Sequence, residues 1–204
     1  RQASHRHLDM LSVTVSINGR DAILDCGTGV YFGSDDFRKW FRSEKAHSGV
    51  FSQDERWGEI RGPFEITKSA TGKIEMIENG ILAECVGKKR GKSKREVKIE
   101  DGRIVIVDHI ELDNPVVNFV MPFGTEIKNI GDVVMLEGPG FTLEHWPVPT
   151  SISVSDLTPS QIKSGKIMDN MAVLSNGYGS FEGCKIFHLM HKRGVNTKSV
   201  LWGS

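Results

Sequence analysis

Cysteine is scarce in this sequence. The chain of 204 residues has three, Cys26, Cys85 and Cys184, and they stand far apart. An odd number at wide spacing argues against a disulfide framework and indicates free thiols in a reducing compartment. No uninterrupted apolar run approaches the roughly 20 residues that cross a bilayer, and residues 1–10 lack the apolar core of a signal peptide. We therefore expect an intracellular, cytoplasmic protein without membrane contact.

An excess of charge of one sign is also lacking, because 26 basic residues balance 26 acidic ones. This balance excludes a highly charged or disordered chain and implies no bulk electrostatic partner. The one concentration of charge is a basic run at residues 88–95, for which we expect a solvated loop or hairpin tip. By counterion release it could make a weak contact with nucleic acid. Its charged residues are Lys88, Lys89, Arg90, Lys92, Lys94 and Arg95.

Helical patterns are few, and β-branched residues, glycines and short alternating runs dominate residues 11–154. Asn-Gly and Asp-Gly pairs between these runs predict tight hairpin turns. The pattern therefore predicts an all-β or β-rich fold, with short helices only after Ser34 and after Thr158. The expected strands cover residues 12–17, 21–24, 64–67, 73–77, 81–86, 96–99, 103–107, 116–121 and 132–136.

One carboxylate occupies an unusual position. Asp25 follows a short apolar strand and enters the glycine-rich bend Cys26-Gly27-Thr28-Gly29. A carboxylate at the end of a buried strand is costly unless backbone N–H groups or a second carboxylate satisfy it. The residues leave two interpretations open. Asp25 caps its own turn, as aspartate often does beside glycine, or it belongs to a catalytic pair that shares a proton.

Residues 17–28, from Ile17-Asn18-Gly19 to Leu24-Asp25-Cys26-Gly27-Thr28, resemble the retropepsin-like aspartic proteases of copia-type retrotransposon Pol polyproteins. Further motifs follow in the same order as in that family. They are Ala70-Thr71-Gly72-Lys73, similar to its flap hairpin, the apolar run 116–122, the strand-like run 129–136, and residues 191–201, similar to the signature that opens its pre-integrase segment.

The resemblance implies a retropepsin-like closed β-barrel over residues 8–150, with residues 151–204 as a C-terminal extension. It implies an aspartic endopeptidase in which Asp25 pairs with its symmetry mate in a homodimer and activates water. Cys26, Gly27 and Thr28 would form the active-site turn, and Ala70, Thr71, Gly72 and Lys73 the flap over a peptide or polyprotein substrate. No metal or cofactor is implied, and the protein would act in the cytoplasm or within a virus-like particle.

Other interpretations remain open. Cys26 replaces the Ser or Thr that supports the protease turn, and a thiol is a weak donor, so an inactive retroelement-derived binding or assembly module is one alternative. A metallo-β-lactamase-like hydrolase is another, because residues 24–29 match L-[IL]-D-C-G-x-G. The run His5-Arg6-His7-Leu8-Asp9 also resembles its H-x-H-x-D metal box, although it precedes the turn instead of following it. We expect His5 and His7 to lie in a mobile terminus.

Two further patterns of cysteine and histidine suggest a catalytic thiol and a zinc half-site. Cys26 could act as a nucleophile with His47, His109 or His145, but nothing in the sequence places a cationic neighbour beside it. Cys184, His188 and His191 have spacings that half a zinc site tolerates, yet no later Cys-x-x-Cys pair completes it. For both patterns we expect a structural role, with Cys26 a small buried hydrophobe and the two histidines on a helix.

Overall fold

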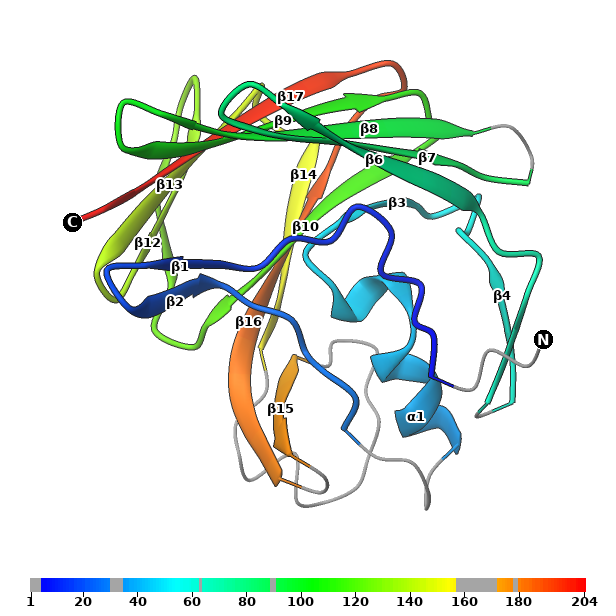
Figure 1. The fold of residues 1–204 in the computed structure, drawn as a ribbon. Coiled ribbons are helices and arrows are strands. Elements are labelled where there is room, and N and C mark those ends of the chain that lie inside the picture. Colours follow the sequence, from blue (N-terminus) through cyan, green and yellow to red (C-terminus); the bar gives the residue numbers. More distant parts are fainter. Residues whose placement is uncertain (1–4, 30–34, 63, 89–90, 157–171, 178–179) are drawn as a thin grey trace.

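A computed structural model of the chain describes residues 5–29, 35–62, 64–88, 91–156, 172–177 and 180–204. The expectation of a β-rich fold is confirmed. Two large sheets dominate, and every strand pair within them is antiparallel. In Figure 1 the larger sheet crosses the top of the molecule and the smaller one descends below it.

The larger sheet has eight strands. Asp101-Gly102 forms a tight turn between β8 and β9, with positive φ at both residues, as the sequence predicts. The order across the sheet is β11 (Glu126–Ile130), β12 (Val134–Gly138), β13 (Phe141–Trp146), β17 (Asn196–Gly203), β9 (Arg103–Ile110), β8 (Lys92–Glu100), β7 (Gly80–Val86) and β6 (Thr71–Ile77).

The smaller sheet has five strands, and β10 is central to it. Its order is β14 (Ser151–Asp156), β16 (Ser180–Met190), β10 (Pro115–Pro122) and β3 (Val50–Ser52), with β15 (Val173–Gly177) also paired to β16. Seven of the eight residues of β10 are buried, which explains why it reads as a continuous apolar run.

Short elements connect the sheets. Strands β1 (Val15–Ile17) and β2 (Arg20–Ile23) form one hairpin through Asn18-Gly19, and β4 (Glu59–Arg61) pairs with β5 (Glu65–Thr67). The expected helix after Ser34 is α1 (Asp35–Phe41), and the short 3-10 helix η1 (Glu44–Ala46) follows it. Figure 1 shows α1 below the larger sheet and beside the smaller one.

The main core lies between the two sheets. Alternate residues of β10, Val117, Phe119 and Met121, pack there with side chains from the larger sheet such as Ile106 and Leu143. The opposite face of β10 contributes Val120 to a second cluster with Phe41 of α1 and Ile186 of β16. The period of two along a strand thus divides β10 between two apolar environments.

The structure corrects several expectations. The closed barrel is not observed, because the larger sheet ends in the edge strands β6 and β11. Within residues 151–204, β16 pairs with β10 and β14, and β17 pairs with β13 and β9, so both large sheets combine strands from before and after position 150. Strands such as β16 were missed because Gly, Glu, Lys and His interrupt their apolar pattern. The expected helix after Thr158 lies outside the described residues.

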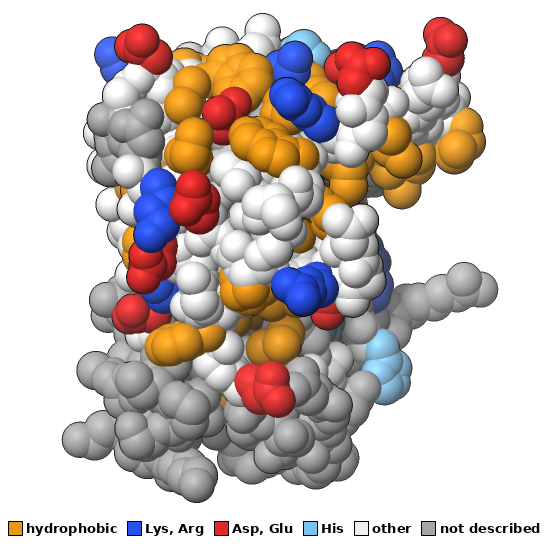
Figure 2. Space-filling model, turned by 90° about the vertical axis from the view of Figure 1, so that its left-hand side faces the viewer, with side chains coloured by type: hydrophobic (Ala, Val, Ile, Leu, Met, Phe, Trp, Pro, Cys, Tyr) orange, Lys and Arg blue, Asp and Glu red, His pale blue; other side chains and the backbone are white. Residues whose placement is uncertain are grey.

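The described surface and thiols agree with the composition. Figure 2 shows basic and acidic side chains scattered among hydrophobic ones on one face, without a dominant sign of charge. Cys26, Cys85 and Cys184 are buried free thiols, as predicted. Within the described ranges, no helix is long and apolar enough to span a membrane.

Candidate functional site

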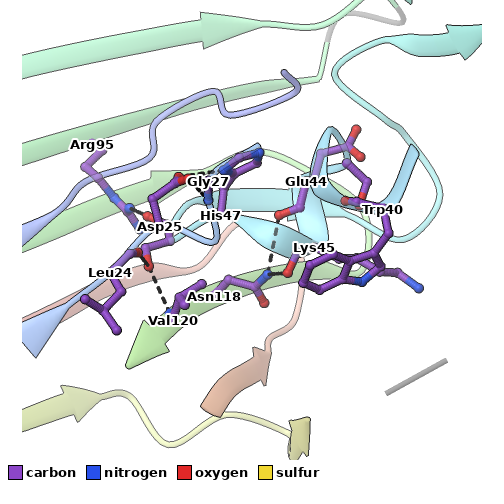
Figure 3. Close-up of polar contacts among 12 residues, drawn as sticks. Leu24, Asp25, Gly27, Trp40, Glu44, Lys45, His47, Arg95, Asn118 and Val120 are labelled. Atoms are coloured by element: carbon purple, nitrogen blue, oxygen red, sulfur yellow. Dashed lines mark hydrogen bonds and ion pairs between the residues drawn. The ribbon is translucent and has the colours of Figure 1, made fainter. Parts of the chain in front are cut away.

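The strand end that carries Asp25 is fastened to the central strand β10. The Leu24 N–H donates to the carbonyl of Val120 at 2.8 Å, and the Ser48 hydroxyl donates to the carbonyl of Leu24 at 2.8 Å. The same hydroxyl accepts the Val120 N–H at 2.9 Å. These bonds hold the backbone on either side of Asp25 in one position (Figure 3).

Both oxygens of the Asp25 carboxylate have partners. Oδ1 accepts the Gly27 N–H at 2.8 Å, and Oδ2 lies 2.6 Å from Nδ1 of the buried His47. Gly27 has a φ of +73°, which brings its N–H round to the carboxylate. Burial raises the pKa of Asp25, but the bond and charge of His47 and the Gly27 N–H outweigh it, so the pKa lies below its usual value. Asp25 is therefore a carboxylate at neutral pH, held by a histidine and its own turn.

A second histidine packs against this pair. The rings of His7 and His47 lie 5.2 Å apart, centroid to centroid, and tilted by 46°. Burial, the charge of His47 and the charge of Arg38 lower the pKa of His7 to about 4. His7 is thus neutral at pH 7 and able to accept a proton or a ligand bond. The half-buried His7 thus packs against the site, and a mobile terminus stays a prediction.

Arg38 of α1 and Arg42, the residue that follows the helix, add two buried guanidinium groups at positions four apart. Arg42 donates from Nε to the carbonyl of Arg6 at 2.9 Å, and Arg38 donates to the carbonyl of Thr28 at 3.3 Å. Burial and the charge of Arg38 lower the pKa of Arg42. The two arginines fasten the N-terminal segment and the Asp25 turn to the helix, and they make this region electropositive.

A cavity of about 340 Å³ opens beside the cluster of His7, Asp25 and His47. Its walls combine imidazole, carboxylate, hydroxyl and indole groups, which suit proton transfer and hydrogen bonding to a polar ligand. The lining residues are His5, Arg6, His7, Leu8, Asp9, Met10, Thr28, Trp57 and Ser69.

The donor types at this site are those that zinc uses. However, no group of three His, Cys, Asp or Glu side chains is arranged to hold a metal ion within the described residues. Nδ1 of His47 and Oδ2 of Asp25 are at hydrogen-bond distance. His47 Nε2 is buried and has no hydrogen-bond partner among the described residues.

The other residues expected to form the protease site are placed as follows. Cys26 is buried in the apolar cluster next to α1, and Thr28 lines the cavity. Ala70 is buried and donates its N–H to the carbonyl of Trp57, whereas Thr71, Gly72 and Lys73 begin the exposed edge strand β6. Since β6 pairs with β7 along its whole length, residues 71–73 form part of a sheet and lie far from the tip of the β6–β7 hairpin.

The cysteine and histidine patterns do not assemble into sites. His109 lies on β9 and His145 on β13, where its Nε2 is 3.0 Å from Nε2 of His191. Cys184 and His188 lie on strand β16, not on the expected helix, and His188 bonds to Asn118 and Ser155. Cys184, His188 and His191 thus have separate surroundings, which agrees with the expected structural role.

The basic run is only partly a loop. Lys92, Lys94 and Arg95 lie in β8, where both lysines pair with Glu84 and Arg95 pairs with the buried Asp108. Lys88 precedes the strand, and Lys89 and Arg90 lie outside the described residues. A weak contact with nucleic acid remains a prediction.

Sequence reasoning missed His47, Arg38 and Arg42 as parts of this site, and it set His7 aside. The available signal was the pair of histidines in His5-Arg6-His7 together with a lone buried aspartate, since a buried carboxylate needs a partner. Nothing local indicated that His47 would be that partner, because it lies 22 residues away in the chain.

Comparisons with known proteins identify the fold. The family described as "Heparinase II/III-like, C-terminal" matches residues 1–123, more than half of the chain. A heparinase III structure with methylated lysines superimposes with a TM-score of 0.69 at 19% identity, over 98% of this chain and 30% of that one. The heparan sulfate lyase HepC from Pedobacter heparinus gives a TM-score of 0.66 at 16% identity, over 98% and 31%. The chain therefore spans about three tenths of these proteins.

Another heparinase III structure gives a TM-score of 0.66 at 15% identity, over 98% of this chain and 30% of that one. No curated protein matches the chain.

These findings overturn the retropepsin resemblance. The predictions of an aspartic protease, a retrotransposon polyprotein and an inactive retroelement module were all wrong. They rested on short motifs in a matching order, and such motifs do not establish a shared fold. The chain belongs to the heparinase II/III-like C-terminal family.

Proposed function

We propose that this chain is the β-sandwich domain of a polysaccharide lyase of the heparinase type, acting on an acidic polysaccharide such as heparan sulfate. The family match and the likeness over nearly the whole chain support the domain assignment. The observation that carries the proposal is the cluster of His7, Asp25 and His47 beside a polar cavity. The neutral imidazole of His7 and the buried arginines suit chemistry on an anionic sugar.

The reaction would be a β-elimination at a uronic acid unit. A base removes the proton at C5, next to the carboxylate, and the electron pair forms the C4–C5 double bond. The bond from C4 to the glycosidic oxygen breaks, and an acid protonates that oxygen. The products are a chain with a new hydroxyl end and a chain with an unsaturated uronate end. Such proton transfers by a positioned histidine accelerate reactions by roughly 10²- to 10⁴-fold.

His5 is the side chain that we assign to proton transfer. It is exposed and lines the cavity, whereas His47 is buried and held by Asp25. His7, His47 and Asp25 would position the segment that carries His5, and the buried arginines would favour the anionic substrate. The rest of the substrate site would come from the part of the protein outside these 204 residues, because the solved relatives are about three times as long.

The test uses the natural protein that contains these residues, incubated with heparan sulfate. We expect ultraviolet absorbance from the conjugated unsaturated uronate to appear with time. His5→Gln should reduce the rate roughly 10²- to 10⁴-fold, and His109→Gln, an exposed histidine on β9, should not. Absence of the chromophore with heparan sulfate and with other uronate polysaccharides would refute the proposal. Equal rates for His5→Gln and wild type would refute the role of His5.

A second candidate function of the same cluster is binding of a divalent metal. The observation that favours it is the row of His7, His47 and Asp25, whose donor types many zinc sites use, although these side chains are not arranged around an ion here. Nδ1 of His47 and Oδ2 of Asp25 lie 2.6 Å apart. An increase in this distance of less than about 1 Å would let both atoms bind one tetrahedral ion. Elemental analysis of the purified protein should then give one zinc per chain. His47→Gln should lose the ion and His109→Gln should keep it.

A further inference from the structure

A second and larger cavity lies on the other side of α1. It has a volume of about 790 Å³ and opens between α1, η1 and the face of the five-stranded sheet that carries Asn118, Ser155 and His188. The α1 residues Asp36, Lys39 and Trp40 line it, whereas Arg38 and Arg42 point to the first cavity's side. The two cavities share no lining residue among those described. We call the larger one the α1 groove.

A polar network centred on Asn118 holds Ser155 and His188, which form the floor of the α1 groove. Asn118 donates from Nδ2 to the carbonyl of Lys45 at 3.3 Å, which turns its Oδ1 toward Nδ1 of His188 at 2.7 Å. Nδ1 of His188 therefore carries the hydrogen, and Nε2 accepts from the Ser155 hydroxyl at 3.0 Å. Burial and the charge of Lys45 lower the pKa of His188 to about 4. The floor is thus neutral at pH 7.

The rim carries three cations with different surroundings. Lys39 pairs with Asp36 at 3.5 Å, and Arg56 pairs with Glu44 at 3.0 Å. Lys45 is exposed, and no carboxylate pairs with it among the described residues. The half-buried ring of Trp40 lines the same groove and lies edge-on to the ring of Phe41, with centroids 5.0 Å apart. Figure 3 shows Lys45 and Trp40 near each other. The groove therefore offers a positive charge next to a fixed aromatic face.

From this arrangement we infer that the α1 groove is a second binding site for an acidic sugar unit of the polysaccharide. One sugar ring packs on Trp40, and its carboxylate or sulfate binds Lys45. Aromatic side chains supply a large rigid contact surface, and an ammonium group binds an anion as a point charge. The inference rests on the proposed function for its ligand class. It adds a site where the chain holds the polymer away from the place of cleavage.

The test is a binding titration of the natural protein with a fluorescently labelled heparan sulfate hexasaccharide. Lys45→Gln should weaken binding by about two- to fivefold, as expected for one exposed ion pair. The matched control is Lys128→Gln, a half-exposed lysine on the distant strand β11, which should leave binding unchanged. Trp40→Leu should weaken binding of the same probe, with far-ultraviolet circular dichroism as a check on folding. A neutral cellohexaose of equal length should bind weakly to all four proteins.

The two proposals fail in different ways. If Lys45→Gln binds the hexasaccharide as tightly as the wild-type protein does, the inference is overturned, regardless of the result for Trp40→Leu. If Lys45→Gln weakens binding but the wild-type protein never forms unsaturated uronate, the lyase proposal fails and the binding site stands. On a short substrate that fills only the site of cleavage, Lys45→Gln should be as active as wild type. A loss of activity there would also overturn the inference, because the groove would then not be a separate site.

Discussion

Nδ1 of His47 lies 2.6 Å from Oδ2 of Asp25, although the two residues are 22 positions apart and occupy different segments. This contact replaces the symmetric pair of aspartates that a protease needs, because the second oxygen of Asp25 is already bonded to the Gly27 N–H. It also joins the end of β2 to the segment after η1. The half-buried carboxylate is therefore satisfied within one chain.

The Asp25 pair should make stability depend on acid pH. The pKa of Asp25 is lower in the folded protein than the ordinary value of 3.8, so its contribution is complete above that value and is lost as pH falls through the folded pKa. Asp25→Asn should lower the free energy of unfolding at pH 7 by roughly 1 to 3 kcal/mol. Urea denaturation from pH 7 to pH 2 should show this difference shrinking. Glu100→Gln, at an exposed position, serves as the control. A constant difference across this range would contradict the prediction.

The buried ion pair of Arg95 and Asp108 should be costly to break from one side. Arg95 donates to Asp108 at 2.7 and 3.0 Å, and also to the carbonyls of Leu11 and Ser48. Arg95→Met leaves a buried carboxylate, so we expect a loss of about 3 to 5 kcal/mol in the free energy of unfolding. The double variant Arg95→Met/Asp108→Leu should lose less in the same urea denaturation. A double variant no more stable than the single one would contradict this explanation.

The facing imidazoles of His145 and His191 should destabilise the fold in mild acid. Burial and the charge of His191 lower the pKa of His145 to about 3, and burial lowers that of His191 to about 4. The unfolded chain binds protons near pH 6.5, so stability falls as pH decreases from that value toward 4. Thermal unfolding of His191→Gln should show a shallower fall than wild type between pH 7 and pH 4. Parallel curves would count against the assignment.

The turn between β8 and β9 should require glycine at position 102. Gly102 has a φ of +73°, and no atom lies within 4 Å of the position that a Cβ would take. Gly102→Ala should therefore cost only the backbone strain, roughly 1 kcal/mol. Gly102→Asn should cost less, because asparagine tolerates this conformation. Equal losses for both variants in urea denaturation would show that some other effect dominates.

Much of the secondary structure was predictable from local patterns. The turns at Asn18-Gly19 and Asp101-Gly102 follow from the tolerance of these residues for positive φ. The apolar run of β10 and the short helix α1 were also found where expected. Strands β13 and β17 were missed because buried His145, Thr142 and Ser199 replace apolar residues on faces that tertiary contacts cover. Local patterns cannot report such long-range burial.

The resemblance to a retropepsin failed for the same reason. A strand, an Asn-Gly turn and a second strand that ends in Asp25 describe a hairpin, and hairpins of this kind serve many folds. What distinguishes them is the partner of the carboxylate, and that partner comes from elsewhere in the chain. His47 and His7 have no local feature that marks them as neighbours of Asp25.

The sequence by itself determined the β-rich class, the turns, the free thiols and the balanced charge, because each depends on the composition or on residues adjacent in the chain. Only the tertiary structure decided the order of strands in the two sheets and the meeting of His7, Asp25 and His47. It also decided that α1 separates a histidine-lined cavity from a second groove. The physical reason is that pairing between distant strands sets these neighbours, and no short segment contains both partners of a long-range contact.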